Sequence, residues 1–89
     1  MNSHEHIEKA IQLESLPDWV DRVIVRDMVD ADGESALDVV LVVRDDRVDV
    51  IRDGAQLAVA RDLVHRAVRK TDSERWPYTR FLSVSDLAA

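Results

Sequence analysis

Residues 36–44, Ala-Leu-Asp-Val-Val-Leu-Val-Val-Arg, hold the longest apolar run in the chain, which Asp38 and Arg44 bracket. Four of its residues are valine, and β-branched side chains favour a pleated strand, so this run predicts the central strand of a sheet. Residues 21–29 are expected to alternate between two faces: Val23 and Val25 share one, and the other carries Arg22, Ile24, Arg26 and Met28. The polar loop at 30–35 contains Gly33, which suits a turn, so the two strands are expected to form an antiparallel hairpin.

Two further segments show helical spacing of their apolar residues. Residues 4–16 place Ile7, Ala10 and Ile11 on one stripe, with Leu13 as a further candidate, and the helix is expected to end before Pro17. A second helix is predicted from Asp53-Gly54 to about Lys70. Its apolar stripe consists of Leu57, Ala60, Leu63, Val64, Ala67 and Val68. Basic residues crowd the end of this helix, where its dipole favours them.

The remaining segments complete a small α+β domain. A third strand is predicted at about 78–84, followed by a short tail from Ser85, whereas 45–53 fits either an edge strand or a segment tucked under the second helix. The element order is α-β-β-α-β, and we expect residues 1–89 to form one domain with two helices on one face of a three-stranded sheet. The helices would cover the side chains of Leu37, Val39, Leu41 and Val43. Trp19 is expected to join this core, and the direction of the third strand stays open.

The other sheet face is the most informative feature of the sequence, because no segment remains to cover it. Its predicted residues are Arg22, Ile24, Arg26, Asp38, Val40, Val42 and Arg44. Apolar positions in the middle with charged positions around them are typical of a surface that binds another protein or a second copy of the chain. The alternative is a tolerated surface shielded by opposite charges on neighbouring strands.

Composition narrows the classes of partner. The chain has 89 residues, 46% of them hydrophobic, and a formal net charge of −6. This acidic balance argues against nucleic acid, whose phosphates require clustered cations. The sequence contains no cysteine, its amino terminus lacks the pattern of a signal peptide, and its apolar run is too short to span a membrane. We therefore expect a cytoplasmic protein that does not bind membranes.

Residues with metal or catalytic chemistry are sparse. The loop Asp30-Ala31-Asp32-Gly33-Glu34 has the character of a calcium loop but lacks the further acidic ligands of one, so we expect a solvated acidic turn. His4 and His6 have no third ligand nearby in sequence, and His65 is expected to flank the apolar stripe of its helix. No glycine-rich phosphate loop is present. The sequence predicts no metal, no cofactor and no enzymatic activity.

The layout of the chain resembles minimal nucleotidyltransferase domains, in which a helix, a hairpin with carboxylates entering its second strand, a helix and a third strand follow in order. The segment from Gly33 through residue 43 carries this resemblance. The Gly-Ser pair that the family has after its first strand is replaced by residues 27–30, Asp-Met-Val-Asp. Of the family's paired aspartates only Asp38 is present, since Ala36 occupies the other position, and Thr79, Phe81 and Ser83 stand where a third acid would be expected. Two-metal transfer needs several converging carboxylates, so the resemblance implies an inactive relative.

A second resemblance is to small uncharacterised bacterial proteins with the same acidic loop, here residues 32–37, and the same Trp-Pro-Tyr-x-Arg-Phe segment, here residues 76–81. It implies no activity. The sequence therefore predicts a protein-binding module of unknown specific role, acting as a homodimer or with a partner in the manner of an antitoxin. Two alternatives stay open. One is a degenerate nucleotidyltransferase-like domain that binds a nucleotide through Asp32, Glu34 and Asp38; the other is nucleic-acid binding by arginines of the sheet face, namely Arg22, Arg26, Arg44 and Arg80.

Overall fold

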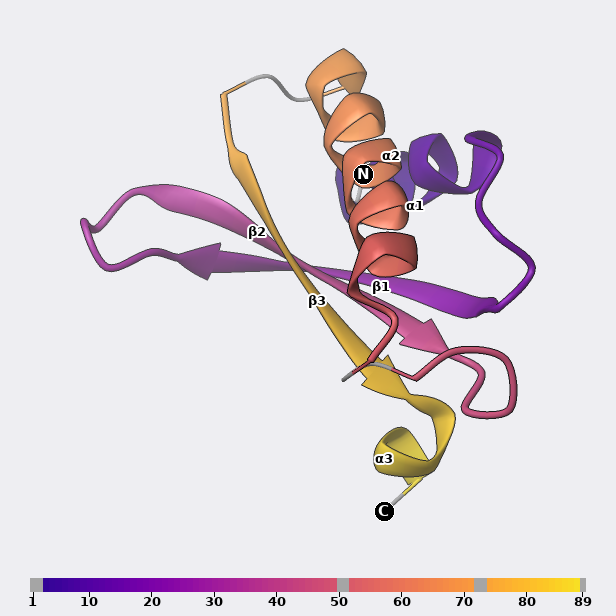
Figure 1. The fold of residues 1–89 in the computed structure, drawn as a ribbon. Helices are drawn as coiled ribbons and strands as arrows, with labels where there is room; N and C mark the ends of the chain where they lie inside the picture. The colour runs from indigo at the N-terminus through magenta and orange to yellow at the C-terminus, as the bar shows by residue number, and fades with distance from the viewer. Residues whose placement is uncertain (1–2, 50–51, 72–73, 89) are drawn as a thin grey trace.

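A computed structural model of the protein describes residues 3–49, 52–71 and 74–88. The elements follow in the order α1 (Ser3–Leu13), β1 (Val20–Val29), β2 (Ser35–Val43), α2 (Gly54–Thr71), β3 (Trp76–Ser83) and α3 (Val84–Ala88). The three strands form one sheet in the order β1-β2-β3 (Figure 1). The predicted α+β class and the α-β-β-α-β order are confirmed. The short helix α3 occupies the predicted tail from Ser85 and also includes Val84, which was predicted as the end of the third strand.

The β1–β2 hairpin is built around a turn that Asp30 stabilises. The Asp30 Oδ1 atom accepts hydrogen bonds from the backbone N–H groups of Asp32, at 2.9 Å, and Glu34, at 3.0 Å. Gly33 has φ of +81°, a left-handed conformation that glycine adopts without a steric penalty. The strands pair antiparallel, with Val23 opposite Leu41. The predicted hairpin is therefore confirmed, and its tip extends beyond the helices (Figure 1).

β3 lies parallel to β2, on the opposite side of it from β1. A parallel neighbour requires a crossover connection, and α2 provides it by packing across the sheet between the two strands. This decides the strand direction that the sequence left open. The sheet is consequently mixed, with β2 in the centre and buried on both faces, while β1 and β3 form the two edges.

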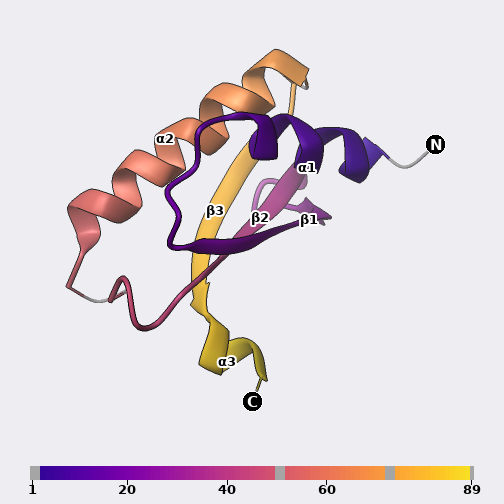
Figure 2. The same cartoon turned by 90° about the vertical axis from the view of Figure 1, so that its right-hand side faces the viewer.

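α1 and α2 lie together on one face of the sheet, as predicted (Figure 2). The core between them contains the inward side chains of β2 and β1 together with the helix stripes. Its buried members are Ile7, Ile11, Trp19, Val23, Val25, Leu37, Val39, Leu41, Val43, Val48, Leu57, Ala60, Val64, Ala67 and Val68. Leu13 does not belong to it: its side chain is 86% exposed at the end of α1, so its assignment to the stripe was wrong.

No helix in the described ranges is both long enough and apolar enough to cross a membrane.

The segment before α2 forms no strand over its described residues, 45–49 and 52–53. Val48 is buried in the core, which favours the tucked arrangement over the edge strand. Asp53 organises the start of α2, since its backbone carbonyl accepts a bond from Leu57 N–H at 3.1 Å. Its carboxylate also accepts a 2.7 Å bond from Asp49 N–H. Val50 and Ile51, which the sequence also considered for this segment, lie outside the described residues.

Candidate interaction surface

The sheet face opposite α1 and α2 is formed by alternate residues of all three strands. Strand pairing places Arg22 opposite Val42, Ile24 opposite Val40 and Arg26 opposite Asp38. On the other side of β2, the register aligns Asp38 with Tyr78, Val40 with Arg80, and Val42 with Leu82. We call these residues the outer sheet face: Arg22, Ile24, Arg26, Met28, Asp38, Val40, Val42, Tyr78, Arg80 and Leu82. Arg44, which the sequence also assigned to this face, lies one residue beyond β2. Its Nη2 atom is 4.0 Å from Asp21 Oδ1.

The valines of this face are not exposed. Val40 is 3% and Val42 0% exposed, although neither belongs to the core beneath α1 and α2. Both stand on the central strand, where longer side chains of the edge strands flank them: Ile24 and Arg80 beside Val40, and Arg22 and Leu82 beside Val42. The expectation of an open apolar patch centred on the two valines was therefore wrong. These short residues of the central strand lie between longer side chains of both edge strands, and they are buried although neither α1 nor α2 packs over them.

Asp38 and Arg80 form the best-defined polar contact of the outer sheet face. The guanidinium donates from Nε to Oδ1 at 3.0 Å and from Nη2 to Oδ2 at 3.1 Å, a bidentate geometry that strengthens the pair. Hydrogen bonding to Arg80 lowers the pKa of Asp38, against the opposing effect of its partial desolvation, and nearby Arg26 lowers this pKa further. The same bond raises the pKa of Arg80. The aspartate of this face is thus already neutralised within the chain.

Cations dominate what this face presents to solvent. Arg22 and Arg26 are exposed, and among the described residues no ion pair involves either of them. Ile24 is only partly buried, and so are Met28 and Leu82. Tyr78 is 42% exposed and donates a 3.3 Å hydrogen bond to Asp30 Oδ2. The exposed surface is therefore cationic, with half-buried apolar groups between the arginines.

In the acidic turn, the carboxylate of Asp30 has partners within the chain. Its Oδ1 atom accepts bonds from the backbone N–H groups of Asp32 and Glu34, and its Oδ2 atom accepts the bond from Tyr78. Across the described ranges, no group of three histidine or acidic side chains is arranged to hold a metal ion. Asp32 and Glu34 lie at the hairpin tip, whereas Asp38 stands inside β2 and pairs with Arg80. These three carboxylates are therefore not brought together in the described part of the chain, and residual nucleotide binding stays a prediction.

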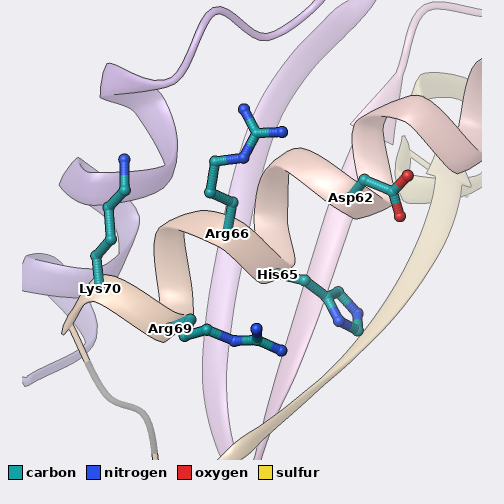
Figure 3. A pocket seen from close by; sticks show the side chains of 5 residues that line it. All are labelled: Asp62, His65, Arg66, Arg69 and Lys70. Carbon is teal, nitrogen blue, oxygen red and sulfur yellow. The ribbon is translucent and has the colours of Figure 1, made fainter.

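A second surface, which the sequence did not single out, lies on the exposed side of α2. A shallow hollow of about 490 Å³ is lined by Asp62, His65, Arg66, Arg69 and Lys70 (Figure 3). We call its four basic residues, His65, Arg66, Arg69 and Lys70, the cationic ridge. The sequence interpretation explained the basic residues only by the helix dipole. Their i, i+3 and i+4 spacing was the signal that would have placed them side by side.

The His65 ring links this ridge to the edge strand β3. It packs edge-on against the ring of Trp76, with centroids 5.0 Å apart and an interplanar angle of 87°. Desolvation lowers the pKa of His65; nearby Arg61 and Arg69 act in the same direction, while Asp62 opposes them. The imidazole consequently favours its neutral form more than a free histidine does. Trp76 itself remains 54% exposed, whereas Trp19 is buried.

Comparison with known proteins found no match to this chain among family models, curated proteins or solved structures.

Proposed function

We propose that this protein is a non-enzymatic binding module that engages another protein through its outer sheet face. The observation that carries this proposal is the cationic face itself: Arg22 and Arg26 stand exposed on a sheet surface that neither long helix covers. Arginine is enriched in protein interfaces, and the half-buried Ile24 and Leu82 provide apolar contact area beside it.

Charge favours a partner that supplies carboxylates. The face holds Arg22, Arg26 and Arg80, and its only acid, Asp38, is already paired with Arg80. In a two-fold dimer the same surface would meet itself, so unpaired arginines would approach unpaired arginines. Like charges brought together in this way oppose association. A different protein with acidic side chains therefore fits this face better than a second copy does.

The test uses selection from a random peptide library on the immobilised protein. Peptides selected by the wild type should be rich in Asp and Glu, and their affinity should fall about three- to tenfold in the double variant R22Q/R26Q, since each exposed ion pair is worth up to about a factor of five. The control is K9Q/R52Q, which also removes two exposed cations, Lys9 on α1 and Arg52 in the segment before α2, where Arg52 pairs with Asp49. If the selected peptides bind R22Q/R26Q with the same affinity as the wild type and K9Q/R52Q, the assignment of this face is wrong.

Two further measurements separate the alternatives. Light scattering at rising protein concentration tests self-association, and a dimer that R22Q/R26Q dissociates would make the second copy the occupant. Titration with a uridine oligonucleotide at two salt concentrations tests the nucleic-acid alternative, for which exposed Tyr78 beside arginines is the favouring observation. Tight, salt-sensitive binding of the oligonucleotide, lost in R22Q/R26Q, would replace the protein partner by RNA.

A further inference from the structure

Charge is distributed unevenly over this acidic chain. The protein has 12 Lys and Arg residues and 18 Asp and Glu residues, yet α2 contains four of the former and a single acid, Asp62. The rest of the chain therefore carries more negative charge than the net value of −6 suggests. The surface of α2 is a local cationic region on a strongly acidic molecule. Such asymmetry orients an approaching anionic group toward this helix.

Two cations of the ridge, Arg66 and Arg69, are available to a ligand. Arg66 and Arg69 are exposed, and no ion pair within the described part of the chain involves them. Figure 3 shows Arg66 and Lys70 pointing to one side of α2, and His65 and Arg69 to the other. Lys70 already contacts a carboxylate from another element, since its Nζ lies 3.4 Å from Glu14 Oε1 of the segment after α1. A carboxylate is thus an anion that this surface accommodates.

We propose that the cationic ridge, together with exposed Trp76, is a second docking surface that binds an acidic segment of a protein. Guanidinium groups match carboxylates in charge and geometry, and an exposed Trp beside them supplies the apolar contact typical of strong interface residues. This proposal does not depend on the function of the outer sheet face.

The shape and charge of the ridge favour a peptide over other anions. The hollow is open and is lined by residues of one helix, whereas sites for small molecules enclose most of their ligand. A long nucleic acid would extend beyond the ridge onto surfaces with excess acidic charge, and repulsion there would oppose its binding. A short acidic segment avoids this repulsion, because it covers only the ridge.

The test uses a decaglutamate peptide, with decaglutamine as the uncharged control, and follows the His65 ring by NMR. We expect decaglutamate to shift the His65 ring signals, to raise the pKa of that ring and to protect Trp76 from iodide quenching. Buried Trp19 contributes little to that quenching. Decaglutamine should do none of these. In R66Q/R69Q the affinity read at His65 should fall about three- to tenfold, and in R22Q/R26Q it should stay unchanged.

R66Q/R69Q and R22Q/R26Q remove the same charge from different surfaces. Each variant therefore tests one proposal, and either proposal can be refuted while the other stands. Equal His65 responses in wild type and R66Q/R69Q would overturn the ridge as the docking surface, whatever happens at the sheet face. No response at His65 to decaglutamate would overturn it as well. A response to decauridylate that exceeds the response to decaglutamate would show that the ridge serves nucleic acid instead. Gln favours helix nearly as well as Arg, and far-ultraviolet circular dichroism of both variants verifies that α2 stays folded.

Discussion

Replacing Val42 by glutamate should test the packing of the outer sheet face directly. Val42 is fully buried on the central strand, although no long helix covers it. A carboxylate at this position would lose water on burial, and the effective penalty for an ionised group in a protein interior is several kcal/mol. Arg22, directly opposite, can pair with the new charge and offset part of this penalty. We therefore expect V42E to lower the free energy of unfolding by about 3 kcal/mol or more at pH 7.

This loss is large for a protein of 89 residues, whose total stability is expected to be about 4–13 kcal/mol. With a urea m-value of about 1–2 kcal/mol per molar, the unfolding midpoint should fall by about 1.5–3 M, or the variant should be unfolded without urea. The penalty should shrink at pH 5. Burial raises the pKa of the new carboxyl in the folded state, so the folded variant binds the extra proton and gains stability as the pH falls.

The matched control is I24E, on the same face but at a partly exposed position, where a charge keeps contact with water and the cost should stay below about 1.5 kcal/mol. A midpoint for V42E within about 0.3 M of the wild-type value would refute the reasoning. It would mean that Val42 is open to solvent and that the face carries the apolar patch suggested by the sequence alone.

Three other expectations concern the core, the ion pair and the acidic turn. L41A should destabilise the protein by about 2–5 kcal/mol in urea unfolding, because Leu41 is fully buried beneath the helices and its loss leaves a cavity. D38N should remove the contribution of the Asp38–Arg80 ion pair to the free energy of unfolding, which is about 1 kcal/mol or less. Because the folded pKa of Asp38 is lowered, that contribution is present above its ordinary pKa of 3.8 and is lost as the pH falls through the folded value, so D38N should flatten this part of the pH–stability curve. Calorimetry should detect no tight Ca²⁺ binding; saturable micromolar binding that D32N abolishes would contradict the solvated-turn interpretation.

The linear pattern of residues determined the elements of this protein and their order. Alternation at 21–29, the valine run at 36–44 and the helical spacing at 54–70 are local signals, because each depends only on the repeat of strand or helix. The same signals predicted which sheet face the helices cover, since Leu37, Val39 and Leu41 follow one another at two-residue intervals and therefore lie on one side of β2. The limits of α1 and β3 were less accurate, because helix and strand ends depend on neighbouring elements.

Tertiary structure decided what the surfaces present. Val40 is buried between its strand partners Ile24 of β1 and Arg80 of β3, and Asp38 is neutralised by Arg80, which lies far from it in the sequence. Neither fact follows from local periodicity, because both depend on the direction and register of β3. That strand is parallel to β2 because α2 carries the chain back across the sheet. The contact of His65 with Trp76 has the same origin: two aromatic side chains meet only when the helix and the edge strand pack together.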